Sequence, residues 1–298
     1  MAPIEASRLL IVDGHAYAYR AFYAIRQLTS PSGAPTNAIY GFISMAAKII
    51  SRLEPSHCFV AWDGGLASER VAALPAYKEH RPPMPPDLEQ QLAGIGRYLQ
   101  ATKCAAYCQD GVEADDVIAT LARRATGAGL RVVIASSDKD FMQLVSPEIG
   151  LLNPGDKSEK VWTSDDVFSK TGVWPPQIVD WLSLIGDAVD NIAGVPGVGP
   201  KTAAGLLEQF GSVEALYARL EEVKSSPLRE NLRRAAEVVK RNQGLIRLNE
   251  NLPGAFSFEE MAVKLADAKE LRLLYEEWGF KKMLAQLEPV DSAQRDLL

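Results

Sequence analysis

Three carboxylates stand within four residues at one point of the chain. Glu113, Asp115 and Asp116 follow Gly111 and open a segment whose apolar residues recur with a helical period as far as Gly127. Acids in a first helical turn are stabilised by the positive end of the helix dipole, so these residues could be an ordinary solvated helix start. They could instead bind a hard divalent cation, which prefers carboxylate oxygens. Other stretches of the chain help to decide between a solvated helix start and a cation site.

Further acids follow short apolar runs of the kind that form buried strands. Such runs alternate with helical segments, which predicts an α/β fold with a mostly parallel central sheet covered by helices. In such sheets, ligand sites lie beyond the carboxyl ends of the strands. Several carboxylates on one rim repel one another unless cations lie between them, which favours metal binding. The runs and their acids are residues 9–12 with Asp13, residues 58–62 with Asp63, and residues 132–135 with Asp138 and Asp140.

The composition is that of an ordinary globular protein. The chain has 298 residues, of which 47% are hydrophobic and 23% charged, enough for one sizeable core and a smaller one. Its amino-terminal residues lack the pattern of a signal peptide and no apolar run has membrane length, so we expect a cytoplasmic protein. The net charge of −6 argues mildly against a nucleic-acid partner. Divalent cations bound to the acids would reverse the local field, and the scattered cysteines and histidines predict no zinc site.

Residues 64 to 86 form a segment rich in glycine and proline without a long period. A loop of this length inside a compact domain is usually functional or disordered. Its basic and aromatic side chains beside an acidic metal site suit a single-stranded nucleic acid, although a solvated linker is the alternative. Arg20, on a predicted helix at residues 16–24, could meet a phosphate or pair with a carboxylate. The residues of interest in the segment are Arg70, Tyr77, Lys78, His80 and Arg81.

A glycine-rich turn lies between two predicted helices after residue 176. The first helix, at residues 177–185, precedes Asp187 and Asp190, which are spaced to share one side of a turn. The second begins at Pro200, and a tight turn before it exposes backbone N–H groups to an anion such as a DNA phosphate. The pattern favours a helix-hairpin-helix at residues 192–210. Its expected DNA contacts are Gly194, Gly197, Gly199, Lys201 and Thr202.

Ordered motifs extend from residue 9 to about residue 287. They are Val12-Asp13-Gly14 with Tyr19-Arg20-Ala21-Phe22, Trp62-Asp63-Gly64, Tyr77 to Pro85, Gly111 to Ile118, Ser137-Asp138-Lys139-Asp140, and Gly186 to Ala203. Together they resemble the bacterial 5′ nuclease family. This family comprises the 5′-3′ exonuclease and flap endonuclease domain at the amino end of DNA polymerase I, and is related to phage and eukaryotic flap endonucleases.

Two departures from the family pattern stand out. Where the family commonly reads Phe-Arg-His after the second acid, this chain has Glu69-Arg70-Val71, which places a negative charge near the expected path of the substrate. The serines usual between the last two acids are replaced by Ala188-Val189, which removes hydroxyls but no ligand.

The resemblance implies a Mg²⁺-dependent phosphodiesterase that binds DNA with a 5′ flap, a nick or a 5′ single-stranded arm and cuts the arm near its junction with duplex. Two Mg²⁺ ions, for which Mn²⁺ can substitute, would activate a water and stabilise the leaving oxygen. Lys78 and Arg81 would hold the scissile phosphate and act in catalysis with Asp13 and Asp115, and K⁺ would bind the hairpin carbonyls. The implied ligands are Asp13, Asp63, Glu113 and Asp115 around one ion, Asp138 and Asp140 close by with Asp116 in the same set, and Asp187 and Asp190 towards the second.

The expected organisation is a nuclease core at residues 1–175, a helical DNA-binding subdomain at residues 176–290 and a tail at residues 291–298. We expect a monomer without membrane contact, associated with the nucleoid during repair, that is either complete or the front of a polymerase. A non-catalytic protein that binds branched DNA on the same fold is the alternative, and an RNA nuclease of a related fold would leave the hairpin unexplained. A basic stripe is interpreted as a solvated face: Arg229, Arg233, Arg234, Lys240 and Arg241.

Overall fold

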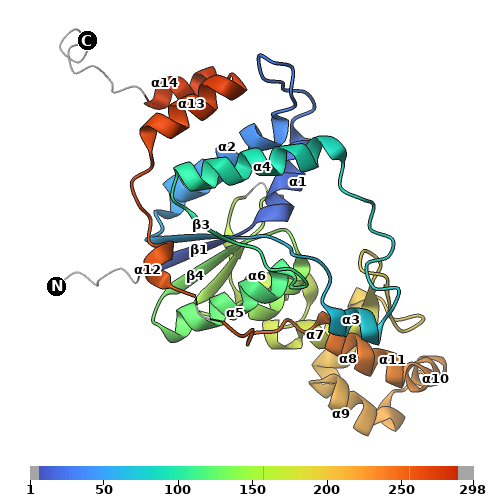
Figure 1. Ribbon diagram of the computed structural model, residues 1–298. Helices are drawn as coiled ribbons and strands as arrows, with labels where there is room; N and C mark the ends of the chain where they lie inside the picture. Colours follow the sequence, from blue (N-terminus) through green and yellow to red (C-terminus); the bar gives the residue numbers. More distant parts are fainter. Residues whose placement is uncertain (1–6, 157, 255, 288–298) are drawn as a thin grey trace, which may run out of the picture. The chain divides into compact units, whose positions relative to one another are not determined.

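The computed structural model describes residues 7–156, 158–254 and 256–287 (Figure 1). The expected tail at residues 291–298 lies outside the described residues. Contacts within the chain divide it into two compact units. The nine predicted acids belong to the first unit and Arg20 to the second. The first unit is Met1–Asp13, Ala61–Pro83 and Tyr107–Phe256, and the second is Gly14–Val60, Met84–Ala106 and Ser257–Leu298.

Strands of the first unit lie in the order β1-β4-β5-β6. β1 and β4 are parallel, with Leu9 opposite Val132 and Ile11 opposite Ile134, and β5 is parallel to β4. β6 closes this edge as an antiparallel strand. Parallel neighbours end at the same edge, so the acids that follow β1 and β4 meet there, and the predicted mostly parallel sheet is confirmed. The bounds are β1 (Arg8–Asp13), β4 (Arg131–Ala135), β5 (Ile149–Leu152) and β6 (Val161–Trp162).

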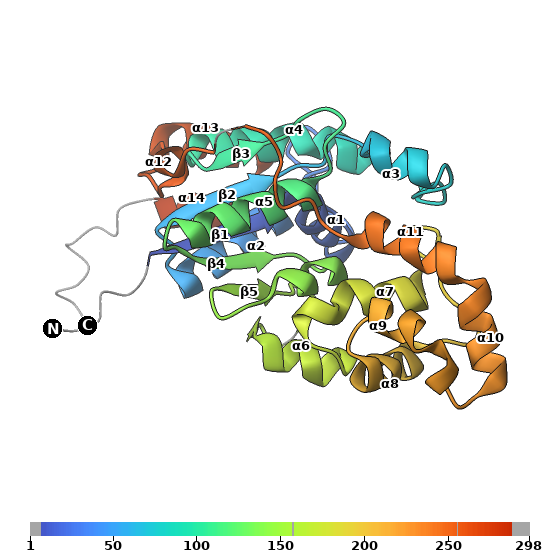
Figure 2. The ribbon, with the colours of Figure 1, turned by 90° about the horizontal axis from the view of Figure 1, so that it is seen from below.

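One long helix, α5 (Ala114–Gly127), packs against β1 and β4 (Figure 2). Its buried side chains Val117, Ile118 and Leu121 recur with the helical period and form the face that covers the sheet. Glu113 precedes the helix in an extended conformation, so the three acids cluster at its first turn as predicted. A 3₁₀ helix, η1 (Lys139–Leu144), follows β4, and α6 (Ser164–Thr171) follows β6.

α7 (Ile178–Ile185) packs against α8 and α11 (Figure 2), and α3 and α10 pack against α11. Two short antiparallel strands between α7 and α8, β7 and β8, were not predicted from the sequence. These helices and the strands β1, β4, β5 and β6 belong to one compact unit, and the boundary between residues 175 and 176 stays a prediction. The other elements are η2 (Pro175–Gln177), β7 (Gly186–Asp187), β8 (Ile192–Ala193), α8 (Pro200–Phe210), α9 (Val213–Ala218), η3 (Leu220–Glu222), α10 (Ser226–Arg234) and α11 (Ala236–Ile246).

The glycine- and proline-rich segment at residues 64–86 is not a loop throughout. It contains a short helix, α3 (Ser68–Ala73), that packs against α11. Turns follow α3, in which Tyr77 N–H donates to the Leu74 carbonyl at 2.8 Å. The first part of this segment is therefore held in place by packing and by hydrogen bonds.

The second unit is a helical layer with two neighbouring strands, β2 and β3. α2 packs against α1 and α4, and Figure 1 shows α2 and α4 side by side. Gln91 of α4 accepts hydrogen bonds from the N–H groups of Ala38 at 2.7 Å and Ile39 at 3.3 Å, which caps the first turn of α2. No helix in the described part of the chain is long and apolar enough to cross a membrane. The elements are α1 (Gly14–Ala24), α2 (Asn37–Leu53), β2 (His57–Ala61), α4 (Pro86–Ala101), β3 (Ala105–Tyr107), α12 (Phe258–Met261), α13 (Ala268–Trp278) and α14 (Lys281–Leu287).

Candidate functional site

A buried hydroxyl joins the carboxyl ends of β1 and β4. Asp13 Oδ2, at the end of β1, accepts a hydrogen bond of 2.7 Å from Ser136 Oγ, directly after β4. Ser136 Oγ in turn accepts a 3.1 Å hydrogen bond from the N–H of Asp138. Ser136 is fully buried, so these bonds fix the Asp13 carboxylate in place. Ser136 was not among the predicted site residues, although its position between a buried strand and Asp138 was an available signal.

Carboxylates of Asp115, Asp138 and Asp140 lie within electrostatic range of one another. Burial raises the pKa of Asp115, and the negative charges of Asp138 and Asp13 raise it further. Burial likewise raises the pKa of Asp140, with added repulsion from Asp138 and Asp190. The Oδ1 atom of Asp140 is buried and has no hydrogen-bond partner. These acids therefore converge, as the strand ends predicted, and repel one another in the absence of cations.

The last two acids lie on the turn of the β7-β8 hairpin. Asp187 Oδ1 accepts a hydrogen bond of 2.9 Å from the N–H of Val189, and Asp187 Oδ2 lies 3.1 Å from Lys139 Nζ. Asp190 Oδ1 accepts a hydrogen bond of 2.6 Å from Arg81 Nη2. Both acids also add to the repulsion that raises the pKa of Asp140, so they face the same cluster. Lys139, inside a motif quoted above, had no predicted role.

Both oxygens of Glu113 are occupied by hydrogen bonds from the segment at residues 64–86. Glu113 Oε1 accepts from the N–H of Ala67 at 3.1 Å, and Oε2 accepts from Tyr77 Oη at 3.2 Å and from Lys78 Nζ. The side chain is only 1% exposed. Burial raises its pKa, but the charges of Lys78 and Arg70 outweigh burial and lower it overall. Glu113 thus anchors the basic segment in this structure, and its role as a metal ligand stays a prediction.

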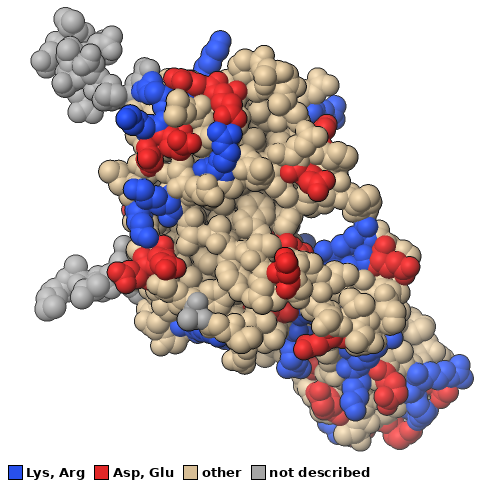
Figure 3. All heavy atoms as spheres, in the orientation of Figure 1, with Lys and Arg blue, Asp and Glu red and all other residues tan. Residues whose placement is uncertain are grey.

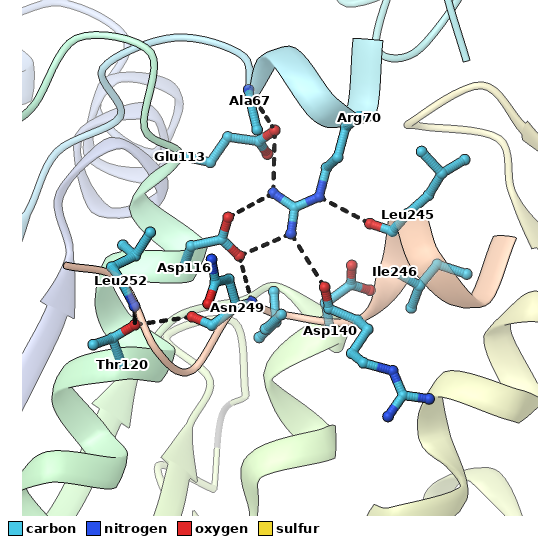
Figure 4. Close-up of polar contacts among 12 residues, drawn as sticks. Ala67, Arg70, Glu113, Asp116, Thr120, Asp140, Leu245, Ile246, Asn249 and Leu252 are labelled. Atoms are coloured by element: carbon cyan, nitrogen blue, oxygen red, sulfur yellow. Dashed lines mark hydrogen bonds and ion pairs between the residues drawn. The ribbon is translucent and has the colours of Figure 1, made fainter. Parts of the chain in front are cut away.

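Arg70 and Asp116 are partners in a buried ion pair (Figure 4). The Nη1 and Nη2 atoms of Arg70 donate to the two oxygens of Asp116 at 2.9 and 2.8 Å, and its Nε donates to the Leu245 carbonyl at 3.0 Å. The Arg70 guanidinium also lies 3.3 Å from Glu113 Oε1. Arg70 was expected to contact DNA and Asp116 to bind metal. In the structure, the planar fork of Arg70 joins α3, α5 and the end of α11, and the two expected roles stay predictions.

Tyr77 and Lys78 are buried rather than displayed to solvent, at 4% and 6% exposure. Tyr77 is therefore not placed to stack on a base, because its ring is enclosed and its hydroxyl bonds to Glu113. Burial lowers the pKa of Lys78, but the charges of Asp115 and Glu113 raise it overall and keep the ammonium charged. Lys78 has a φ of 57°, a costly conformation for a residue with a side chain, and its N–H donates to the Asp190 carbonyl at 3.1 Å. Its ammonium consequently lies beside the acid cluster.

Asp63 follows β2 beside the turn that leads to Glu113. The N–H of Gly64 donates to the Val112 carbonyl at 3.0 Å, and the N–H of Gly111 donates to the Gly64 carbonyl at 2.8 Å. A Cβ atom on Gly64 would lie 1.8 Å from the backbone oxygen of Gln109, so only glycine permits this approach. This contact places Gly64, which follows Asp63, next to residues 111 and 112, which precede Glu113.

The glycine-rich turn before α8 has the predicted hairpin form. The N–H of Val195 donates to the Leu184 carbonyl at 2.8 Å, and the N–H of Val198 donates to the Val195 carbonyl at 3.0 Å. Both valines are buried, which leaves Gly197, Gly199 and Lys201 exposed, with Thr202 half-buried. A Cβ atom on Gly194 would lie 2.3 Å from the backbone of Ile185, so this approach requires glycine, and the DNA contact of Gly194 stays a prediction.

The predicted basic stripe divides into two groups. Arg229, Arg233 and Arg234 of α10 form ion pairs with Glu221 and Glu230. Figure 3 shows the resulting alternation of acidic and basic side chains over α8 to α10. This part of the stripe is the solvated face that the sequence predicted. The second group, Lys240 and Arg241 of α11, makes no ion pair in the described structure.

The donor set of the acid cluster fits hard divalent cations. Among the described residues, no three His, Cys, Asp or Glu side chains are already grouped as a metal site. The converging side chains nevertheless offer only carboxylate oxygens, the ligands that Mg²⁺ and Mn²⁺ prefer. Asp140 Oδ1 is buried without a partner, and burial together with mutual repulsion raises the pKa of Asp115 and Asp140. A bound cation would supply the missing partner and remove the repulsion.

Carboxylates at the end of a mostly parallel sheet, flanked by cations and joined to a helical hairpin, are typical of phosphodiesterases of the nuclease class. The family model of the 5′-3′ exonuclease N-terminal resolvase-like domain matches residues 8–172, and that of the 5′-3′ exonuclease C-terminal SAM fold matches residues 173–269. The chain therefore belongs to the 5′-3′ exonuclease family and is a phosphodiester hydrolase.

Two kinds of curated relative match nearly the whole chain. The 5′-3′ exonuclease of Aquifex aeolicus is 36% identical over 291 residues, which cover 97% of this chain and 99% of that protein. DNA polymerase I of Bacillus caldotenax is 38% identical over 289 residues, which cover 96% of this chain but 33% of the polymerase. The chain thus spans about one third of the length of the polymerases that it matches.

Solved structures show the same fold. The T5 5′-exonuclease with bound zinc ions has a TM-score of 0.68 at 23% identity and covers 81% of this chain and 90% of its own. A complex of the T5 flap endonuclease with DNA and metal ions has a TM-score of 0.68 at 19% identity and covers 94% and 98%. The catalytic core of Rad2 with a DNA substrate has a TM-score of 0.63 at 16% identity and covers 95% and 93%.

Proposed function

We propose that this chain is a structure-specific 5′-3′ exonuclease and flap endonuclease that uses two Mg²⁺ ions to hydrolyse DNA in replication and repair. The observation that carries the proposal is the convergence of Asp13, Asp115, Asp138 and Asp140 at one end of the sheet, with an unpartnered oxygen on Asp140. The T5 and Rad2 relatives, which were crystallised with DNA, support the choice of substrate.

Two groups of carboxylates are available to hold the ions. Asp13, Asp115, Asp138 and Asp140 would hold the first, and Asp187 and Asp190 on the hairpin turn lie towards the second. When bound, such ions activate a water and stabilise the leaving oxygen. Asp63 and Glu113 are further proposed ligands of the first ion, with Asp116 in the same set. In this structure the oxygens of Glu113 and Asp116 bind the segment at residues 64–86 and the loop after α11. Mn²⁺ has the same oxygen preference and should substitute.

The chain's own residues orient the reacting groups. Ser136 holds the Asp13 carboxylate through a buried hydrogen bond, so this ligand is positioned before substrate arrives. Lys78 is fixed by its bond to Glu113 and carries a positive charge next to Asp115, where charge on a phosphate grows during attack. Arg81 is 39% exposed and pairs with Asp190, so it is the cation of the segment that can turn towards a phosphate.

The hairpin before α8 is proposed to grip the duplex. Gly197 and Gly199 present backbone at the surface, and Lys201 adds a charge at the start of α8. These groups read phosphates and carry no sequence information. A K⁺ ion on the hairpin carbonyls would suit this contact. We further propose that the unit acts as a monomer in the cytoplasm, alone or as the front of a polymerase.

The test is incubation with end-labelled flap, nicked and single-stranded DNA. We expect cleavage of the flap near its junction and stepwise release from the nick, both dependent on Mg²⁺ or Mn²⁺ and both lost in chelator. The single strand should be cut more slowly than the flap. Equal cutting of all three DNAs would contradict structure specificity, and binding without any cleavage would indicate a non-catalytic DNA-binding protein.

A further inference from the structure

A basic cavity lies behind the acid cluster and is not used by the proposed mechanism. It has a volume of about 850 Å³ and is lined by α3, α5, α7, α11 and residues 247–251 of the first unit. Five basic and three acidic side chains line it, although the whole chain has a net charge of −6. Its local charge is therefore opposite in sign to that of the protein.

Two of the three acids of the cavity form ion pairs with two of its basic residues. Asp116 pairs with Arg70, and Glu250 pairs with Arg123 at 2.6 Å. This leaves Glu69 as the acid without an ion pair in the described structure. These two pairs cancel most of their own charge, so they do not account for the positive character of the cavity.

Three cations of the cavity form no close ion pair in the described part of the chain, although Arg247 lies within electrostatic range of Glu214. Lys240, Arg241 and Arg247 make no ion pair within the described residues, and the buried Nε of Arg241 has no hydrogen-bond partner. An unpaired donor of this kind is costly to bury, and a bound anion would satisfy it. Two independent observations, the unpaired charges and the orphan donor, thus indicate an anionic ligand.

The cavity favours single-stranded over duplex DNA. Its volume of about 850 Å³ lies in the range of pockets that hold small ligands, which suits a short stretch of one strand better than a whole duplex. No aromatic side chain lines the cavity in the described structure, so bases cannot stack there. Recognition would therefore run through phosphates and be independent of sequence.

We infer that this cavity binds phosphates of the single-stranded 5′ arm through Lys240, Arg241 and Arg247. The assignment rests on the proposed function, because it takes the substrate's own arm as the ligand. Arg70 connects the two places, since its guanidinium contacts both Asp116 at the cavity and Glu113, which anchors Lys78. An arm held in the cavity would lie against the wall that positions the cations of the reacting centre.

The experiment measures binding in chelator, so it does not depend on cleavage. The test variant is Lys240→Gln with Arg247→Gln, and the matched control is Arg233→Gln with Arg234→Gln, two exposed arginines paired on α10. Each protein is titrated with a flap that has a 12-nucleotide arm and with one that has a single-nucleotide arm, over a series of salt concentrations. A mononucleotide competitor distinguishes the arm from a free phosphate.

For the long arm, loss of two phosphate contacts should reduce the magnitude of the log K against log salt slope by about 1.4, since each single-strand contact contributes about 0.7. At 0.1 M salt this corresponds to binding weaker by about 25-fold, while the short arm and the control variant stay unchanged. Glu69→Gln should strengthen binding of the long arm, because it removes a negative charge from the cavity. If these residues had only a structural role, removing positive charges and removing a negative charge would not change the affinity for the long arm in opposite directions.

Three outcomes would overturn the inference. The first is unchanged affinity of the variant for the long arm, and the second is an equal loss of affinity for both arms. The third is that a mononucleotide displaces the long arm from wild-type protein but not from the variant. The last would assign the cavity to a free nucleotide. Failure of the proposed function has a different signature, since wild-type protein would then bind both arms and cleave neither in Mg²⁺.

Discussion

Arg70 offers the sharpest test of the buried architecture. Arg70→Ala removes the cation that faces Asp116 and Glu113, both almost fully buried. It also removes the donor to the Leu245 carbonyl. Loss of one partner from a buried ion pair leaves the other charge uncompensated and typically costs about 3 to 5 kcal/mol. Glu113 keeps Lys78 and Asp116 keeps the N–H of Asn249, so we expect the lower half of that range, about 3 kcal/mol.

The same structure supplies a matched control. Arg123→Ala breaks an ion pair with Glu250 whose side chains are 43% and 32% exposed. Exposed pairs contribute about 0 to 1 kcal/mol, so this variant should be close to wild type. Arg70→Lys restores the charge without the planar fork and should recover only part of the loss.

Equilibrium unfolding in urea, followed by tryptophan fluorescence and by circular dichroism, measures the difference. Coincident transitions from the two probes establish that the free energies can be compared. If Arg70→Ala lies within about 1 kcal/mol of wild type, or matches Arg123→Ala, the ion pair does not stabilise the first unit as argued.

Three further results are expected. Ser136→Ala frees the Asp13 carboxylate and should raise the Mg²⁺ concentration for half-maximal cleavage by about 10-fold or more, as other supporting contacts of metal ligands do; an unchanged Mg²⁺ titration would contradict this. Lys201→Ala should weaken duplex binding at all sequences and reduce the magnitude of the salt slope by about 0.9, and an unchanged slope would remove it from the interface. The pKa of Glu113 is lowered in the folded state, so its stabilisation is present above its unfolded pKa of about 4.3 and is lost as pH falls through the folded value. Glu113→Gln should accordingly flatten the pH dependence of the urea midpoint below about pH 4.3, whereas an unchanged acid limb would show that other groups cause it.

The sheet and its acids could be predicted because their signals are local. An apolar run at residues 9–12 forms β1, and the helical period after Glu113 forms α5, so the positions of Asp13 and Asp115 follow from neighbouring residues. Parallel pairing then brings the strand ends together without knowledge of any side-chain contact. The same logic did not find Ser136, because a serine after a strand has no period and its partner, Asp13, is 123 residues away.

The burial of the basic segment could not be read from the sequence. Arg70 and Lys78 stand among glycines, prolines and charged residues, a composition that indicates exposure. Their partners are distant, since Arg70 meets Asp116 after 46 residues and Leu245 after 175. Charged side chains are buried only when such partners exist, and only the folded chain shows them. The strands β7 and β8 were not predicted for another reason: strands of two residues are too short to show an alternating pattern.

Asp115→Asn tests the central claim, that the converging carboxylates hold the ions that cut DNA. Single-turnover cleavage of a flap is measured over a Mg²⁺ titration for wild type and the variant, with DNA affinity measured in parallel. We predict that wild type is inactive in chelator and active in Mg²⁺, and that the variant binds the flap at least as tightly, because one repelling charge is gone, but does not cut it at any Mg²⁺ concentration. Cleavage by wild type in excess chelator, or wild-type rates in the variant, would contradict the account.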